Sequence, residues 1–346
     1  MYLSETVKYL IRFEAERAVT LTGPESRIFV AGHRGLVGSA IVRALERAGH
    51  RQIIVRTRAE LELTDQRAVR EFFASTPIDL VFVAAGKVGG IVFNRDFQAD
   101  FLYENLMIGT NVIEAAARSG VRKLLYLGSS CIYPRLAAQP MREDSFLTGP
   151  LEPTNEGYAI AKIACVKLCE KYRLQYGRSF ISAIPTGLYG EYDNFHPDHS
   201  HVIPGLMRRF HEAKLRGDSE VVIWGTGEPV REFLHVDDVA EALLLLMHSH
   251  EGGDPINIGT GEGTSIRSIA EAIRGVVGYT GRIVFDPSKP DGMPRKALNG
   301  DRMRALGWAP RCSLQEGLER TYRWAVERGV FEAKVGSRAG QGMGSG

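Results

Sequence analysis

Cysteine is scarce in this chain, with 4 among 346 residues, at positions Cys131, Cys165, Cys169 and Cys312. None of these residues forms a CxxC pair or any other spacing typical of metal ligands. This pattern excludes a disulfide framework and a cysteine-based zinc site. It predicts a protein of a reducing compartment.

An excess of charge of one sign is also missing: Lys and Arg total 43 against 41 for Asp and Glu, a net charge of +2. Such a balance disfavours general binding to nucleic acid or to a membrane surface. The longest apolar stretch, near 239–247, contains Glu241 and is too short to span a bilayer. The N-terminal residues lack the continuous apolar core of an export signal. We therefore expect a cytoplasmic protein.

What the chain does contain is a regular alternation of short apolar runs and longer amphipathic segments. The runs RIFVAG, QIIVR, DLVFVAAG, KLLYLGSS and FISAIPTGLYG are rich in β-branched residues and lack polar alternation. Strands buried on both faces have this character, and the amphipathic segments between them suit right-handed crossover helices. The sequence predicts an α/β fold with a Rossmann-type, doubly wound parallel sheet.

The alternation changes after Gly190, where a His-rich stretch and a basic helical segment begin. We expect an N-terminal extension over 1–26 and a dinucleotide-binding domain over 27–190, to which later segments such as 232–262 return. A smaller C-terminal α/β substrate domain is predicted over 191–231 and 263–330. Residues 331–346 are rich in glycine and are expected to form a flexible tail.

A glycine-rich turn directly follows the first predicted strand and opens a helix. It reads Gly32-His-Arg34-Gly35-Leu36-Val37-Gly38, a GxxGxxG pattern. In this context the first glycine makes the turn, the second lets the backbone approach a pyrophosphate, and the third lets helix pack on strand. The pyrophosphate would lie at the positive end of the helix. The pattern favours a dinucleotide site over a plain tight turn.

The end of the second strand indicates which dinucleotide binds. An NAD site usually carries an acidic residue there for the ribose 2′-hydroxyl. This chain has Arg56-Thr-Arg58 instead, and Arg34 lies in the glycine turn. Arginine pairs well with a 2′-phosphate, which an acid would repel. We therefore expect NADP(H), with Arg34 and Arg58 as ligands and Arg56 as a weaker third; the alternative is a solvated basic turn.

Tyr158 and Lys162 stand four residues apart, on one face of a predicted helix. A nearby cation lowers the pKa of a phenol, so we expect Lys162 to prepare Tyr158 for proton transfer. Ser129 follows the strand KLLYLG, at the edge where open parallel sheets bind ligands. Cys131 lies two residues further along. The His-rich run 193–204 lacks a complete ligand set at recognisable spacing, so no metal is predicted.

The glycine turn with Ser129, Tyr158 and Lys162 resembles the extended short-chain dehydrogenase/reductases. The further segments GSSCIYP, EPTNEGYAIAK, DNFHPDHSHVIP and SKPDGMPRK, in this order, resemble one family among them, the GDP-L-fucose synthases. The resemblance covers about residues 27–330. It implies an NADPH-dependent 3,5-epimerase and 4-reductase acting on GDP-4-keto-6-deoxy-D-mannose, and a homodimer formed through a four-helix bundle.

The same resemblance implies the roles of individual residues. Tyr158 is the acid at the carbonyl, Lys162 holds the nicotinamide ribose, Ser129 orients the carbonyl, and Cys131 and His201 exchange protons at C3 and C5. A thiol near histidine and other cations is expected to have a lowered pKa. The remaining implied contacts are Ala84, Pro185, Leu188 and His201 with the cofactor, besides the glycine turn, and Arg209, Trp224, Arg231 and Asp291 with the nucleotide sugar.

The chain departs from the family pattern at three glycines. Gly187 replaces an expected Asn, Gly86 an expected Ala, and Gly157 an expected Pro. We expect Gly86 and Gly157 to serve the backbone conformation. Two other interpretations remain open from sequence: an NAD-dependent epimerase or reductase of UDP- or dTDP-sugars, and a non-catalytic NADP-binding regulatory module. The presence of Tyr158 and Lys162 speaks against the second.

Overall fold

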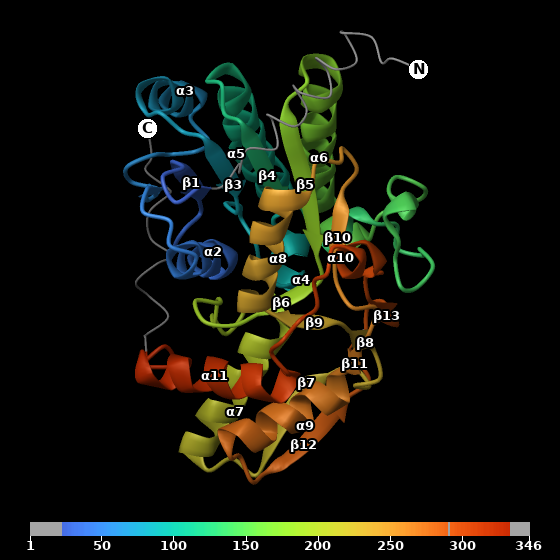
Figure 1. Cartoon of the computed structure of the whole chain (residues 1–346). Coiled ribbons are helices and arrows are strands. Elements are labelled where there is room, and N and C mark those ends of the chain that lie inside the picture. The colour runs from blue at the N-terminus through green and yellow to red at the C-terminus, as the bar shows by residue number, and fades with distance from the viewer. Residues whose placement is uncertain (1–22, 290, 333–346) are drawn as a thin grey trace, which may run out of the picture.

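The computed structural model describes residues 23–289 and 291–332. Most of the predicted extension 1–26 and tail 331–346 therefore lies outside the described residues. A parallel six-stranded sheet forms the centre of the larger unit, in the order β10-β5-β4-β3-β1-β2 (Figure 1). Its strands are β1 (Ile28–Ala31), β2 (Ile53–Ile54), β3 (Leu80–Val83), β4 (Lys123–Leu127), β5 (Ser179–Pro185) and β10 (Ile256–Ile258). The predicted Rossmann-type fold is confirmed.

Helices cover both faces of this sheet, because both faces of its strands are apolar. On one face lie α3 (Gln66–Ser75), α5 (Gln98–Arg118) and α6 (Glu156–Tyr176), which share a core with Phe29, Val81 and Leu124. On the other face lie α2 (Leu36–Arg47) and α8 (Val236–Ser249), packed on Ile28, Phe82 and Leu125. Strand residues thus alternate between two cores, which explains their continuous hydrophobicity.

The strand order reverses between β1 and β3, which creates the switch point where open α/β sheets bind ligands. The turns that follow β1 and β3 touch at this point. A Cβ added to Gly32 would lie 2.7 Å from the backbone of Ala85. The glycine turn therefore lies at the carboxyl edge of the sheet, at the switch point.

A second unit lies below the carboxyl edge of the sheet in Figure 1. It contains α7 (Val202–Arg216), α9 (Ile266–Val277), α11 (Leu314–Glu327) and the parallel pair β7 (Glu220–Trp224) and β12 (Arg282–Asp286). A small sheet joins β11 (Thr264–Ser265), β8 (Val230–Arg231) and β13 (Arg295–Lys296). The remaining elements are α4 (Ile91–Asp96), α10 (Asp301–Ala305), and the pair β6 (Gly187–Tyr189) and β9 (Phe233–His235).

Segment 232–262 connects the two units. It holds β9 beside β6 and then passes through α8 to β10, the last strand of the large sheet. Helix α8 begins where the side chain of His235 accepts a hydrogen bond from the amide of Asp237 (3.3 Å). Acidic Asp237 and Asp238 stand in its first turn, where the helix dipole favours negative charge. Among the described residues, no helix is both long and apolar enough to cross a membrane.

Two helical glycines should respond oppositely to alanine. A Cβ at Gly38 in α2 would lie 2.1 Å from the carbonyl oxygen of Gly32, whereas a Cβ at Gly275 in α9 would meet nothing within 4 Å. We expect Gly38→Ala to lower the free energy of unfolding by about 2 kcal/mol or more. Gly275→Ala should raise it by about 0.5–1 kcal/mol, because alanine restricts the unfolded chain. Urea denaturation measures both, and a neutral Gly38→Ala would contradict the packing described here.

Candidate active site

The glycine turn has the geometry of a pyrophosphate cradle. Gly32 adopts φ +86°, which side chains rarely allow, and its carbonyl accepts the amide of Gly35 at 3.0 Å. Helix α2 then starts at Leu36 with no side-chain cap and no acidic residue in its first turn. Its free amides and dipole thus remain available to an anion. The residues present fit a dinucleotide, with Leu36 and Val37 forming the first turn of the helix.

The arginines expected at the 2′-phosphate have neighbours that the sequence interpretation missed. Arg58 donates its Nε to Glu62 at 2.6 Å, and the guanidinium of Arg56 lies 5.3 Å from the ring centre of Phe72. Glu60 accepts the amide of Thr57 at 2.7 Å, and this hydrogen bond, with the charges of Arg56 and Arg34, lowers its pKa. The basic edge is therefore partly balanced by two carboxylates, and a phosphate would compete with Glu62 for Arg58.

Ser129, Tyr158 and Lys162 meet at the end of β4. Ser129 is the residue before a short 3₁₀ turn (Ser130–Ile132), and its hydroxyl is within hydrogen-bonding reach of the Tyr158 phenol. Lys162 extends from α6, one turn beyond Tyr158, and donates its Nζ to the carbonyl of Leu127 at 2.9 Å. The ammonium lies 5.7 Å from the ring centre of Tyr158. The structure therefore brings this predicted trio together.

The expected lowering of the Tyr158 pKa is wrong for this structure. Burial raises the pKa of Tyr158 well above its ordinary value, and the nearby Cys131 adds to this rise; the hydrogen bond with Ser129 opposes it only in part. Burial also lowers the pKa of Lys162. Both effects have one cause, since loss of hydration disfavours any charged form. Tyr158 is therefore held as a neutral phenol, the form that donates a proton.

Cys131 faces the same pocket as Ser129. Its thiol hydrogen-bonds with Ser129, and the charges of Lys296 and Lys162 act to lower its pKa. The expected lowering of the Cys131 pKa is nevertheless wrong. Burial raises the pKa, and this effect exceeds the opposing effect of the two lysines and of Ser129. The resting thiol is therefore protonated.

His201 directly precedes α7 and lies close enough to Lys296 to be affected by its charge. Neighbouring protein atoms and the charge of Lys296 lower the His201 pKa, although the residue keeps an exposed surface, so the imidazole is neutral near pH 7. Burial lowers the pKa of Lys296, in β13. The charge of Arg231 lowers it further, and the interaction with Cys131 raises it. The sequence interpretation missed Lys296. The pairing of β13 with β8 places it here, although it lies 95 residues after His201 and 134 after Lys162 in the sequence.

The residues implied for the nucleotide sugar form two adjoining pairs in the second unit. Arg209 and Trp224 line one surface pocket of about 340 Å³, and Trp224 is 54% exposed. Arg231 lies near Asp291, whose carboxylate raises the Arg231 pKa against the lowering by burial. Asp291 accepts the amide of Thr226 at 2.7 Å, two residues after Trp224. An exposed indole with two guanidiniums can stack on a base and bind a diphosphate.

The unusual glycines are explained by close packing rather than by backbone conformation. None of Gly86, Gly157 and Gly187 has a positive φ. A Cβ at Gly157 would lie 2.5 Å from the carbonyl oxygen of Gln98, and one at Gly187 would lie 2.7 Å from that of Glu232. At Gly86, a Cβ would meet Asn105 Oδ1 at 2.8 Å. Leu188 follows Gly187 in β6, and Pro185, two residues before Gly187, ends β5. Ala84 directly follows β3.

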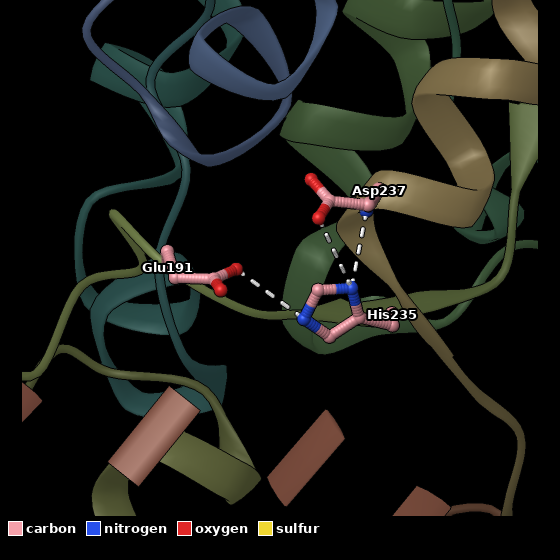
Figure 2. A group of neighbouring side chains, drawn as sticks. All are labelled: Glu191, His235 and Asp237. Carbon is pink, nitrogen blue, oxygen red and sulfur yellow. Dashed lines mark hydrogen bonds and ion pairs between the residues drawn. The ribbon is translucent and has the colours of Figure 1, made fainter. Parts of the chain in front are cut away.

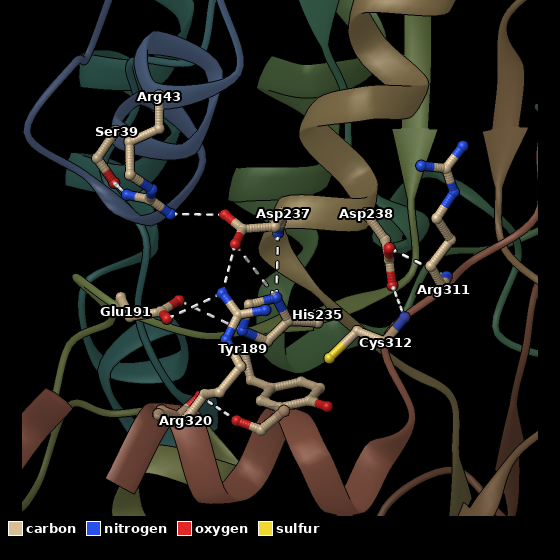
Figure 3. Close-up of polar contacts among 12 residues, drawn as sticks. Ser39, Arg43, Tyr189, Glu191, His235, Asp237, Asp238, Arg311, Cys312 and Arg320 are labelled. Atoms are coloured by element: carbon tan, nitrogen blue, oxygen red, sulfur yellow. Dashed lines mark hydrogen bonds and ion pairs between the residues drawn. The ribbon is translucent and has the colours of Figure 1, made fainter. Parts of the chain in front are cut away.

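A cluster of ionisable groups lies between the two units. Glu191, His235 and Asp237 place ligand atoms within 4.8 Å of one another, an arrangement that could suit a metal (Figure 2). Their carboxylates, however, already pair with two arginines. Arg43 of α2 donates to Asp237 at 2.7 Å, and Arg320 of α11 contacts Asp237 at 2.6 Å and Glu191 at 3.2 Å (Figure 3).

These five residues, which we call the ionic junction, balance two negative charges against two positive ones. Since Nδ1 of His235 accepts the Asp237 amide, its Nε2 carries the proton and faces Glu191 at 3.3 Å. A divalent cation would have to lie beside two guanidiniums, which opposes binding. We therefore interpret the cluster as a link between α2 and α8 of the large sheet and α11 of the second unit, not as a metal centre.

Comparison with known proteins agrees with this geometry. Residues 28–259 match the model of the NAD dependent epimerase/dehydratase family. The chain belongs to this family. It is 57% identical to GDP-L-fucose synthase of Escherichia coli (strain K12) over 312 residues, covering 88% of this chain and 97% of that protein. It is 55% identical to a probable GDP-L-fucose synthase of rice, Oryza sativa subsp. japonica, covering 89% and 94%.

Solved structures lead to the same family. A GDP-mannoheptose C4 reductase from Campylobacter jejuni, with NADP bound, superposes with a TM-score of 0.82 at 35% identity, covering 88% of this chain and 99% of that one. The resemblance to GDP-L-fucose synthases inferred from the motifs is thus confirmed.

The ionic junction should make stability depend on pH. Burial tends to raise the pKa of Glu191, but its contacts with His235 and Arg320 outweigh this and lower it to about 2. Because the folded pKa is below the unfolded one, the stabilisation is complete above about pH 4.5 and is lost as pH falls towards 2. We expect Glu191→Gln to remove roughly 2–3 kcal/mol of this pH-dependent stability.

The check is urea denaturation at several pH values between 7 and 3. Glu327→Gln, at an exposed site in α11, is the matched control and should retain the wild-type pH dependence. An unchanged slope of stability against pH in Glu191→Gln would show that Glu191 does not hold the junction in its ionised form.

Proposed function

We propose that this protein is a bifunctional NADP(H)-dependent 3,5-epimerase and 4-reductase that converts GDP-4-keto-6-deoxy-D-mannose into GDP-L-fucose. The observation that carries the proposal is the hydroxyl of Ser129, which is within reach of both the Tyr158 phenol and the Cys131 thiol. A simple reductase needs only the first of these contacts. A second proton carrier at the same carbonyl supports inversion of the neighbouring carbons as well as reduction.

In this proposal the epimerisation uses the acidity that a 4-keto group gives to the hydrogens on C3 and C5. Cys131 removes a proton from one of these carbons, and His201 returns one to the opposite face. Ser129 and Tyr158 donate hydrogen bonds to the enolate oxygen as its charge develops. Pre-positioned donors in a pocket with little water stabilise that charge strongly.

The resting protonation states of Cys131 and His201 require a proton transfer before epimerisation can begin. In the resting site both the thiol and the imidazole are neutral, so a single proton must pass from Cys131 to His201 to produce the thiolate base and the imidazolium acid. After one inversion the thiol holds the abstracted proton and the imidazole has lost its own. The same transfer is needed again before the second inversion. Lys296, whose charge acts on both groups, favours the thiolate and disfavours the imidazolium.

Reduction takes place at the same carbonyl. The nicotinamide cofactor supplies hydride when bound. Tyr158, held neutral, donates its proton to the oxygen of C4, while Ser129 keeps that oxygen in place. Lys162 stays fixed by the Leu127 carbonyl, and its remaining N–H groups would hold the nicotinamide ribose. Gly32 and Gly35 would hold the pyrophosphate, Gly38 lets α2 pack against the turn, and Arg34 and Arg58 would bind the 2′-phosphate.

Two substitutions should separate the activities. We expect Cys131→Ser to lose inversion at C3 and C5 by about a hundredfold or more while still consuming some NADPH. Tyr158→Phe should lose reduction by a similar factor and keep exchange of the C3 and C5 hydrogens with solvent. NADPH absorbance, deuterium uptake and NMR identification of the products measure these rates on GDP-4-keto-6-deoxy-D-mannose.

Cys169→Ser, a buried thiol of α6 away from the pocket, is the matched control and should behave like wild type. If the wild-type protein binds NADPH but neither binds nor converts the GDP-sugar, the proposal fails in favour of a UDP- or dTDP-sugar enzyme. Equal loss of both activities in both variants would contradict the division of roles.

We further propose a homodimer, located in the cytoplasm, whose interface is formed by α5 and α6. These helices pack on each other and on the sheet, yet they leave large apolar side chains in solvent. Tyr103 of α5 is 63% exposed and Ile160 of α6 is 43% exposed. A second copy of the same helix pair would cover them in a four-helix bundle. The four free thiols support a reducing compartment.

Sedimentation equilibrium at micromolar concentration should give twice the chain mass. Tyr103→Glu with Ile160→Glu should shift the protein towards the monomer, because two buried like charges would face their copies. Leu215→Glu, at an exposed site on α7, is the control and should leave the mass unchanged. A wild-type monomer would refute the dimer without affecting the proposed reaction.

A further inference from the structure

A stack of three aromatic rings borders the loop that leads to His201. This loop, residues 190–200, joins β6 to α7 and has no helix or strand of its own. Within it, the imidazoles of His196 and His199 lie face to face, with ring centres 4.3 Å apart and planes 11° apart. His199 also lies on Phe93 of α4, at 4.2 Å and 12°. Two loop side chains are thus stacked on a helix of the sheet unit.

The stack continues towards the catalytic tyrosine. Phe93 meets Phe101 of α5 edge to face at 5.1 Å, and Phe101 meets Tyr158 edge to face at 6.2 Å. A chain of ring contacts therefore connects the loop before His201 to the phenol at the carbonyl. These contacts join the second unit to the wall of the sheet unit that carries Tyr158.

The backbone is held at the same place. The amide of Gly90 donates to the carbonyl of His199 at 3.0 Å. A Cβ on Gly90 would lie 2.6 Å from the carbonyl oxygen of Ser200. The backbone segments around Gly90 and Ser200 therefore approach as closely as glycine allows. One ring stack and one backbone hydrogen bond therefore hold the loop against the sheet unit. Both contacts involve His199, which lies two residues before His201.

Helix α7 alone does not orient His201. This residue precedes the helix with extended backbone angles, φ −74° and ψ 173°, and no side-chain cap. Its direction follows from the path of residues 196–200 as they enter the helix. A displacement of about 1 Å at a proton donor can cost about a hundredfold in rate, so the seating of this loop bears directly on the reaction.

We propose that the Phe93–His199–His196 stack is a positioning device that holds His201 at the sugar ring and thereby sets the balance between epimerisation and reduction. The proposal rests on the function proposed above. His199 acts here through the face of its ring and exchanges no proton with the substrate. Reduction uses Tyr158 and Ser129 as its proton donor and carbonyl ligand, so we expect it to depend less on the stack than inversion does.

The test compares His199→Ala with His199→Phe, which keeps a flat ring but has no titratable nitrogen. We expect His199→Ala to slow deuterium uptake at C3 or C5 by about tenfold, to lower kcat for inversion more than it raises KM, and to increase reduced products with uninverted centres. His199→Phe should restore the wild-type product ratio. Phe93→Ala should behave like His199→Ala, and thermal unfolding should show that all three variants remain folded.

Each contrary outcome is distinct. Wild-type inversion in His199→Ala overturns the proposal, as does equal loss of inversion in the alanine and phenylalanine variants, which would assign the imidazole a chemical role. Equal losses of inversion and reduction would mark a merely structural contact and also overturn it. If wild type neither exchanges nor reduces the GDP-sugar, the proposed function fails, and this inference fails with it.

Discussion

The buried ammonium of Lys162 is the constraint around which the site is arranged. A cation that is only 4% exposed needs compensation, and here it receives the Leu127 carbonyl at 2.9 Å and the face of Tyr126 at 4.9 Å. This contact ties α6 to the carboxyl end of β4. Because Tyr158 stands one turn before Lys162 and Ser129 follows Leu127 closely, the same contact brings phenol and hydroxyl together.

The low polarity that surrounds Lys162 also governs the neighbouring groups. It keeps Tyr158 and Cys131 protonated. Charges then have to develop during the reaction, when a substrate oxygen can share them. Hydrogen-bond donors and nearby lysines are worth most under those conditions, because little water screens them.

The ionic junction and the ring stack hold the second unit at two separate places. The junction connects α2, α8 and α11 through charges, and the stack connects α4 to the loop before α7 through flat rings. Arg209, Trp224, Arg231 and Asp291 belong to the second unit, whereas Ser129, Tyr158 and Lys162 belong to the sheet unit. A ligand that bridges these sets therefore depends on both links for its alignment.

The sequence by itself determined the sheet, the glycine turn and the Ser129, Tyr158 and Lys162 trio, because local periodicity and fixed spacing encode them. It also led to the family, through motifs that remain in order along the chain. Tertiary structure decided the pKa values, which depend on burial, and the contacts between residues that are distant in the sequence. Sequence spacing predicted lowered pKa values for Tyr158 and Cys131, but burial raises both, since desolvation depends on everything packed around a group. Lys296, the Glu62 partner of Arg58, and the ring stack on His199 likewise came only from chain segments that folding brings together.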